Sequence, residues 1–441
     1  MYHILIVDDE PLICKGLSSL LATSGFDIEH IHTAYNAYEA LDVLKMEEID
    51  LLITDIQMGE INGIELMHQA KMIKPWVQTI IISAHETFQY AQMALRLGAK
   101  DYLIKPLNSR QLLDSVRNVL LKMEKPARAQ EDLLTELQEH FRMEEPDPKK
   151  TEGFNRLISD PEQQLPALRQ LADLGVALQG PYFSVVRIRL RLEERSEVRT
   201  LSASDARLLE YAALNILHEL LNREWRHAAF SSSDHVLSII LEWEEAQVED
   251  ANVNKINLLD MLGRSIHHHI RKYLGLTSVI GISQIVKGTD GLPMLAEQAE
   301  KAMRWNKKHK DHDVFYYGDF NWEGEAQDPS EEEFHAQNND LIDKARAYID
   351  QHYAQKGLTL QEVAQKNHIS PNYLSYLFKK NTGFNLWEYV IKLRMEESKK
   401  LLLQTDMRRY EIAEKVGYES PEHFSKIFKK FYGISPSELK K

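Results

Sequence analysis

Residues 3–10 read HILIVDDE and residues 50–58 read DLLITDIQM, and these two stretches indicate the architecture of the first quarter of the chain. Each holds a short aliphatic, β-branched run next to acids, which is typical of a buried strand and the turn after it. Further strand-like runs alternate with amphipathic helical stretches, which predicts a doubly wound α/β domain over residues 1–122, with helices on both faces of a parallel sheet. The predicted strands are residues 3–7, 28–33, 50–54, 77–82 and 101–104, and the clearest helices are residues 13–21 and 63–72.

Carboxylates follow two of these predicted strands. Asp8 and Asp9 follow the first strand, and Asp55 follows the third. Because sites in doubly wound sheets form at the carboxyl ends of the strands, we expect the three acids to converge. Three neighbouring carboxylates repel one another unless a cation lies among them, and oxygen ligands with room for water suit Mg²⁺.

Two more reactive side chains end strands of the same sheet. Ser83 ends the fourth strand, and Lys105 with Pro106 ends the fifth, where the Lys105–Pro106 bond is a candidate cis peptide. A hydroxyl and an ammonium opposite a Mg²⁺-bound carboxylate make a site for a phosphoryl group that Asp55 attacks. The alternative is that acids after strands are helix caps, which explains one acid but not this whole set in strand order.

Residues 1–122 resemble a receiver domain of two-component signalling, of the flavodoxin-like fold. The matching stretches are ILIVDDE, LLITDIQM, IIISAHE and GAKDYLIKP. The resemblance implies that a phosphoryl group on Asp55 changes the surface of the fourth helix, fifth strand and fifth helix. One position departs from the family, which usually has proline where Gly59 stands. The implied roles are phosphoacceptor for Asp55, Mg²⁺ ligands for Asp8, Asp9, Asp55 and the backbone carbonyl of Gln57, switch pair for Ser83 and Tyr102, and phosphate-facing cation for Lys105.

The central part of the chain is less informative. Residues 123–152 are polar and predict a linker, partly helical, that either pairs with a second copy or is a solvated connector. Residues 153–321 predict an α+β domain, and residues 322–339 an acidic linker. The strands expected in the middle domain are residues 182–190, 235–243 and 278–285, and the helices are residues 258–273 and 293–306.

The stretch that begins VIGIS at Val279 resembles the end of a degenerate GGDEF-like domain. The Gly-Gly-Asp/Glu-Glu-Phe loop is absent, and the expected hairpin reads SSSDHVLSII, so we expect neither cyclase nor other enzyme activity. A spacer or dimerisation role is the better interpretation. His267, His268 and His269 are consecutive and point about 100° apart on a helix, so they are not expected to share a metal ion.

Charge is distributed unevenly along the chain. The net charge is −14, yet residues 338–441 hold 18 Lys/Arg and 13 Asp/Glu, a net +5, which leaves −19 on residues 1–337. A basic C-terminal segment has the charge sign of a DNA-binding module. The single cysteine favours a reducing compartment, and the chain shows neither a signal peptide nor an apolar run of about 18 residues. We therefore expect a cytoplasmic protein without membrane insertion.

The last hundred residues contain an internal repeat. Residues 370–385 read SPNYLSYLFKKNTGFN and residues 420–435 read SPEHFSKIFKKFYGIS, at an offset of 50 residues. Ser-Pro starts a helix in each copy, with serine as N-cap and proline at the first helical position. A short helix precedes each copy, so residues 340–441 predict an all-α domain with two helix-turn-helix units.

One face of each second helix carries donor-rich residues suited to base edges and lysines suited to phosphates. The alternative is a polar surface helix whose lysines favour its C-terminus, which two copies at fixed spacing make weaker. The helix predicted at residues 386–404 would hold the two recognition helices one DNA turn apart, about 34 Å. The candidate DNA-binding residues are Asn372, Tyr373, Tyr376, Lys379 and Lys380 in the first copy, and Glu422, His423, Lys426, Lys429 and Lys430 in the second.

This C-terminal segment resembles the AraC-type DNA-binding domain, most specifically in RMEESKKLLLQT and IAEKVGYESPEHFSKIFKKFYGISP. A receiver joined to such a domain is similar to response regulators that often control carbohydrate uptake or utilisation genes. The resemblance implies a phosphorylation-dependent transcriptional regulator with DNA and a sensor histidine kinase as partners, RNA polymerase as a further contact, and a homodimer as the active form. The alternative is a sugar-responsive regulator that binds its effector in the middle domain and has an idle receiver.

Overall fold

The computed structural model describes residues 1–59, 61–84, 98–123, 147–192, 203–222, 225–232, 235–250, 254–319 and 331–440. The chain forms two compact units. The first comprises Met1–Lys125, Gln337–Asn367 and Leu377–Lys441, and the second comprises Pro126–Ala336 and His368–Tyr376. The N-terminal domain and most of the C-terminal helices therefore belong to the same unit.

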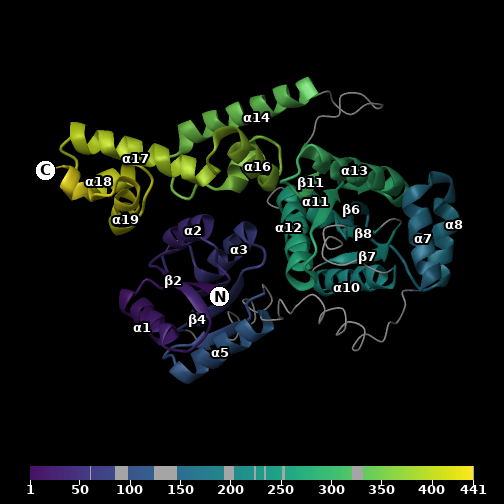
Figure 1. The fold of residues 1–441 in the computed structure, drawn as a ribbon, viewed down its shortest axis with the longest axis horizontal. Helices are drawn as coiled ribbons and strands as arrows, with labels where there is room; N and C mark the ends of the chain where they lie inside the picture. The colour runs from purple at the N-terminus through teal and green to yellow at the C-terminus, as the bar shows by residue number, and fades with distance from the viewer. Residues whose placement is uncertain are drawn as a thin grey trace. The chain divides into compact units, whose positions relative to one another are not determined.

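The N-terminal domain is a five-stranded parallel sheet in the order β2-β1-β3-β4-β5. Helices α1 and α5 cover one face, and α2 and α3 cover the other (Figure 1). This confirms the doubly wound architecture predicted from the sequence. The strands are β1 (Tyr2–Val7), β2 (Ile28–Ala34), β3 (Leu51–Asp55), β4 (Gln78–Ser83) and β5 (Asp101–Ile104), and the helices are α1 (Pro11–Ala22), α2 (Ala37–Met46), α3 (Gly63–Ile73) and α5 (Ser109–Met123).

The continuous apolar runs of this sheet follow from its two covered faces. Every residue of β3 is buried, because its side chains alternate between the cluster under α1 and α5 and the cluster under α2 and α3. Pairing of β1 with β3 sets Val7 beside Thr54, so the residues that follow β1 meet the end of β3. The fourth helix of the predicted pattern lies outside the described residues.

The middle domain is built on a six-stranded mixed sheet in the order β11-β9-β6-β8-β7, with β10 paired to β6. Strand β6 is antiparallel to both β8 and β9, while β11 is parallel to β9. The strands are β6 (Tyr182–Leu190), β7 (Arg226–Ser231), β8 (Val236–Trp243), β9 (Ser278–Ile282), β10 (Val286–Lys287) and β11 (Val314–Tyr316).

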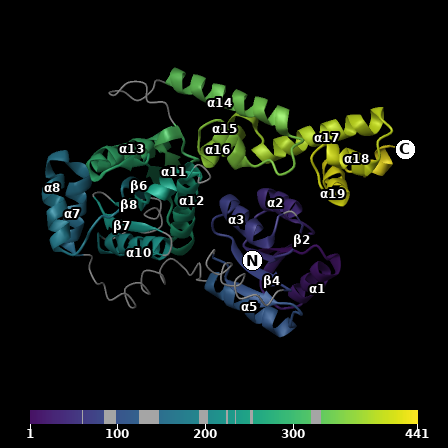
Figure 2. The same cartoon turned by 180° about the vertical axis from the view of Figure 1, so that it is seen from behind.

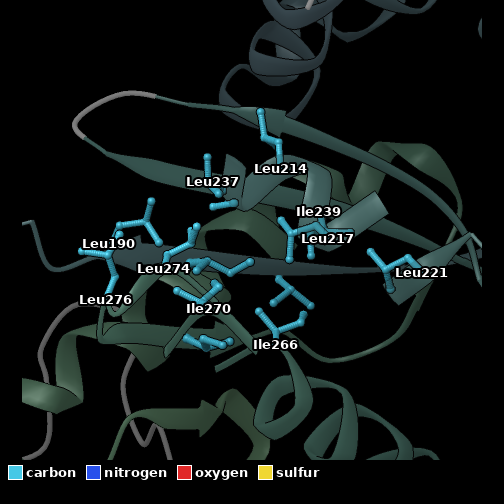
Figure 3. Packing of buried hydrophobic residues seen from close by; sticks show 14 of the residues in the cluster. Leu190, Leu214, Leu217, Leu221, Leu237, Ile239, Ile266, Ile270, Leu274 and Leu276 are labelled. Carbon is cyan, nitrogen blue, oxygen red and sulfur yellow. The ribbon is translucent and has the colours of Figure 1, made fainter. Parts of the chain in front are cut away.

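Helices cover both faces of this second sheet. Helices α10 and α12 bury leucine and isoleucine side chains against one face, as Figure 3 shows for Leu217, Ile239 and Ile266. Helices α7, α8 and α13 cover the other face, with α7 and α8 side by side (Figure 2). The helices are α7 (Pro148–Ser159), α8 (Gln164–Asp173), α10 (Ala203–Leu221), α11 (Glu245–Glu249), α12 (Lys255–Leu274) and α13 (Leu292–Arg304).

The C-terminal segment is helical in the part that the structure describes, as expected. Ser420 caps α19 by accepting a hydrogen bond from the His423 N–H at 3.1 Å, and Gly433 ends that helix with a φ of 78°. Helix α14 begins at Glu331, inside the segment interpreted as an acidic linker. The helices are α14 (Glu331–His352), α15 (Leu360–Lys366), α16 (Pro371–Thr382), α17 (Leu386–Gln404), α18 (Arg409–Lys415), α19 (Pro421–Tyr432) and α20 (Pro436–Leu439).

The contact between α13 and β9 leaves no room for a side chain at Gly281. A Cβ there would lie 1.9 Å from the backbone oxygen of Ala299. We expect Gly281→Ala to force α13 off the sheet and to destabilise the middle domain by about 1–3 kcal/mol, measured by thermal unfolding. Gly16→Ala in α1 is the control, because a Cβ at Gly16 meets nothing within 4 Å and alanine favours a helix by about 0.5–1 kcal/mol. Equal unfolding temperatures for the Gly281 and Gly16 variants would contradict the close contact between α13 and β9.

Candidate functional site

Three carboxylates meet at the carboxyl edge of the first sheet. One ligand oxygen from each of Asp8, Asp9 and Asp55 lies within 4.8 Å of the others. Asp8 and Asp55 are buried and Asp9 is exposed. The strand order explains the meeting, because β1 and β3 are neighbours and their ends lie side by side. Among the described residues this is the one group of acids, histidines and cysteines with the spacing to hold a metal ion.

The ammonium of Lys105 lies between the two buried carboxylates. Its Nζ is 2.9 Å from Asp8 Oδ2 and 3.3 Å from Asp55 Oδ2. The other Asp8 oxygen accepts a hydrogen bond from the Glu10 N–H at 2.9 Å. Lys105 follows β5 and precedes a cis peptide bond to Pro106, as the sequence suggested. The buried negative charge is thus partly balanced by a residue of the same domain.

Burial controls the protonation of these groups. Loss of solvent raises the pKa of Asp55, an effect that Lys105 opposes and Asp8 reinforces. Burial lowers the pKa of Lys105, but hydrogen bonding and charge from Asp8 and Asp55 outweigh it, so its pKa is raised overall. The site therefore holds a permanent cation beside a carboxylate that is destabilised in its charged form. A second cation nearby, or covalent modification that removes the charge, stabilises such a carboxylate.

The loop after β3 approaches α3 very closely. A Cβ on Gly63, the first residue of α3, would lie 1.9 Å from the backbone oxygen of Asp55. The Gly63 N–H donates to the carbonyl of Ile56 at 2.9 Å, which ties the helix start to the strand end. Gln57 lies in this loop and is exposed. Gly59 has a φ of 91°, a conformation that the proline usual at this position cannot adopt.

Ser83 and Tyr102, the predicted switch pair, lie on the neighbouring strands β4 and β5. Ser83 is fully buried at the end of β4, one strand away from Asp55. Tyr102 is partly buried and packs against a cluster that includes Ile56 and Ile81. The strand pairing sets Tyr102 beside Ile81, two residues before Ser83. Both residues therefore lie on the two strands that follow β3, the strand that ends at Asp55, in the order of the sheet.

The candidate DNA-binding residues divide by exposure. Asn372 and Tyr376 are partly exposed, whereas Tyr373 and His423 are buried. The exposed members are Lys379, Lys380, Glu422, Lys426, Lys429 and Lys430. The lysines at the C-terminal ends of α16 and α19 thus keep the accessibility that phosphate contacts need.

Tyr373 and His423 depart from the outward orientation expected of them. They occupy equivalent positions of the repeat, four residues before the buried Leu377 and Ile427. Tyr373 lies within the second compact unit, where its ring centroid is 6.0 Å from that of His312. His423 lies within the first unit, with its Nε2 3.1 Å from Asp42 Oδ2. Remote segments, rather than the local helix pattern, bury both side chains.

Sequence analysis missed a buried arginine at the centre of the C-terminal domain. Arg394 on α17 donates to the carbonyls of Tyr353 and Gln355 at 2.7 and 2.9 Å. Its guanidinium lies 5.0 Å from the ring centroid of Tyr418. No periodicity marks this residue, because arginine is read as a surface residue on an amphipathic helix. The two carbonyl contacts fix the chain between α14 and α15 against α17.

Three protein families match separate parts of the chain. Residues 4–117 match the response regulator receiver domain, residues 159–305 the GGDEF-like domain, and residues 363–441 a helix-turn-helix domain. The order of these matches agrees with the resemblances found in the sequence. The structure describes no helix that is long and apolar enough to cross a membrane.

One relative is similar over the whole chain. The transcriptional regulatory protein YesN of Bacillus subtilis (strain 168) is 25% identical over 444 residues, which cover 100% of this chain and 98% of YesN. The transcriptional regulatory protein HptR of Staphylococcus aureus (strain N315) is 31% identical over 112 residues, 25% of this chain and 44% of HptR.

Solved structures are similar to the two ends of the chain. The C-terminal domain of AraT, a response regulator from Geobacillus stearothermophilus, is 41% identical, with a TM-score of 0.23, and the match covers 23% of this chain and 83% of that domain. A receiver domain protein from Clostridium thermocellum is 30% identical, with a TM-score of 0.26, and the match covers 28% of this chain and 96% of that protein.

The raised pKa of Asp55 predicts a gain in stability when its charge is removed. The folded state holds the Asp55 proton more tightly than the unfolded chain, so the carboxylate costs stability at pH values above its folded pKa. In metal-free buffer with EDTA at pH 7, we expect Asp55→Asn to raise the midpoint of thermal unfolding of the N-terminal domain.

The same linkage fixes the pH dependence of that gain. The gain should shrink as the pH falls below the folded pKa of Asp55 and vanish below 3.8, the ordinary pKa of aspartate, because both states then hold the proton. Asp27→Asn is the control, since Asp27 is 61% exposed and pairs with the N-terminal amine at the surface. A gain that is independent of pH would show that burial of the charge is not its cause.

Proposed function

We propose that this chain, a response regulator that joins an N-terminal receiver domain to a C-terminal AraC-type helix-turn-helix domain, takes a phosphoryl group on Asp55 and thereby changes its binding to DNA. The observation that carries the proposal is the group formed by Asp8, Asp9, Asp55 and Lys105 at one sheet edge. DNA-binding transcriptional regulation is the function that the family supports, and phosphorylation at Asp55 is the part that we add.

The chemistry follows from the contacts of the acids. The Asp55 carboxylate attacks phosphorus, an acyl phosphate bond forms, and the bond from phosphorus to the donor nitrogen of a phosphohistidine breaks. The electron pair of that bond goes to the nitrogen, which takes a proton from solvent. Lys105 already lies 3.3 Å from Asp55 Oδ2, so it can follow the charge as it moves to the phosphoryl oxygens. Ser83, which is buried at the end of the neighbouring strand β4, is the candidate hydroxyl for one of those oxygens.

The donor set suits a hard divalent cation. Two buried carboxylates and one exposed carboxylate offer oxygens within 4.8 Å of one another, close enough to share one ion. The exposed Asp9 leaves one side of the site open to water. Asp8, Asp9, Asp55 and the Gln57 carbonyl would hold Mg²⁺. When bound, Mg²⁺ neutralises charge on the entering phosphoryl group.

The exposed lysines support the DNA half of the proposal. Lys379 and Lys380 lie in the last turn of α16. Lys429 and Lys430 lie in the last turn of α19, at the equivalent positions of the repeat. Two copies of a helix-turn-helix unit within one chain suit adjacent major-groove segments. We further propose a sensor histidine kinase as phosphodonor, contact with RNA polymerase, a homodimeric active form, a cytoplasmic location and control of carbohydrate genes, as the family resemblance implies.

Phosphate transfer to the full chain tests the receiver half directly. With radiolabelled acetyl phosphate and Mg²⁺, we expect wild type to gain acid-stable, base-labile label, as an acyl phosphate does, and Asp55→Asn to gain none. EDTA should abolish labelling, and Asp8→Asn should slow it by at least about tenfold, because a charge-bearing ligand is lost. Asp114→Asn, which changes an exposed acid on α5, is the control. Equal labelling of Asp55→Asn would remove the proposed phosphoacceptor.

The salt dependence of DNA binding tests the lysines. For Lys380→Ala with Lys429→Ala, we expect weaker binding to every duplex sequence and a slope of log affinity against log salt that is smaller by about one for each lost phosphate contact. Lys400→Ala is the matched control, since Lys400 is 65% exposed on α17 and pairs with Glu397. Genome-wide footprinting of wild type and Asp55→Ala then reports whether phosphorylation controls occupancy. An unchanged salt slope would exclude phosphate contacts by these two lysines.

A further inference from the structure

An acidic face of the receiver lies against the second recognition helix, inside the first compact unit. This acidic face consists of Glu39 and Asp42 on α2 and Glu47 just after α2. Its three acids meet the side chains of α19 that were assigned to DNA. Lys426 Nζ is 3.1 Å from Glu39 Oε1, and Lys430 Nζ is 3.3 Å from Glu47 Oε1.

His423 is the buried centre of this contact. Its Nε2 is 3.1 Å from Asp42 Oδ2 and its Nδ1 is 3.4 Å from Glu39 Oε1, so each ring nitrogen faces a carboxylate. Burial lowers the pKa of His423, but hydrogen bonds and charge from Asp42 and Glu39 outweigh it and raise the pKa to about 9. The imidazole is therefore a cation at neutral pH. All three α19 residues thus present positive charge to the acidic face.

Apolar and cation–π contacts extend the same interface beyond the ion pairs. Lys45 of α2 lies with its Nζ 3.7 Å from the ring centroid of Trp387 and donates to the carbonyl of Leu358 at 3.2 Å. Met46 packs against the hydrophobic cluster under α18 and α19. Helix α2 therefore contacts α17, α19 and the turn before α15, which is more than a chance meeting of surface charges.

We propose that the acidic face of α2 is a docking surface for recognition helix α19 and that it competes with DNA for His423, Lys426 and Lys430. Carboxylate oxygens here take the places that phosphate oxygens take on DNA, and they bind the same donors. The inference rests on the proposed function in one respect, namely that α19 contacts DNA. It adds a partner for α19 within the chain, on helix α2 of the receiver.

The burial of the acids supports this assignment. Glu39 is 3% exposed and Asp42 is 9% exposed, although both lie on a surface helix of the receiver. Acids are almost never so buried unless they are paired. Within the receiver, Lys45 pairs with Asp42 and the Tyr35 N–H donates to Glu39, and α19 adds His423 for both acids and Lys426 for Glu39. Since DNA and the acidic face cannot hold the same three side chains at once, each must weaken binding of the other by the same factor.

DNA affinity of the full, unphosphorylated chain tests the competition. The variant is Glu39→Gln with Asp42→Asn, which keeps the shape of both side chains and removes their charge. We expect it to bind a fluorescent 40-base-pair duplex of mixed sequence about tenfold more tightly than wild type, because the competent fraction rises. The control is Glu65→Gln with Asp114→Asn, which changes net charge equally at exposed acids of α3 and α5. If the control variant gains as much DNA affinity as the α2 variant, net charge alone explains the gain and the proposal is overturned.

Hydrogen exchange of the same full chain tests the contact without DNA. We expect amides of residues 37–46 to exchange several-fold faster in Lys426→Glu with Lys430→Glu than in wild type, and to become faster in wild type when duplex DNA is added. Unchanged exchange in the lysine variant would overturn the docking surface. If neither wild type nor the α2 variant binds duplex, the proposed function fails; if both bind with equal affinity, only the competition fails.

Discussion

The ammonium of Lys105 between two buried carboxylates is the interaction on which the receiver site depends. Asp8 and Asp55 lie side by side because β1 and β3 are neighbours, and without a cation their charges would repel in a poorly solvated place. Strand β4 separates β3 from β5, so only a long side chain on β5 can reach them. Lysine meets this requirement, and its mobile stem lets the charge follow the oxygen that carries most negative charge.

The part of this site that the sequence could predict is the part that topology determines. Aliphatic runs marked the strands. Because the carboxyl ends of parallel strands lie at one edge of the sheet, Asp8, Asp55 and Lys105 could be predicted to be neighbours. The helix predicted at residues 386–404 has the same bounds in α17, where Asn385 and Glu388 form a capping box at its start. These features depend on local pattern or on strand order, and both are written in the chain.

The part that could not be predicted depends on contacts between segments far apart in sequence. Tyr373 and His423 were expected to face outward, yet each is buried by residues more than 50 positions away. A weak signal existed, since both precede a buried residue by four positions and so lie at the margin of the apolar stripe. Helical periodicity could not name the partners, because His312 and Asp42 carry no mark of their own that pairs them with α16 or α19.

The uneven charge of the chain acquires a structural meaning from the α2 contact. Lys426 and Lys430 are 54% and 68% exposed, so their ion pairs are weak and screened by salt. The strong element is His423, which is enclosed between two carboxylates. A contact with one buried histidine between two acids and two exposed lysines beside it is specific in register but modest in strength. Such a balance suits a surface that must hold a recognition helix in one state and release it to a denser array of phosphates in another.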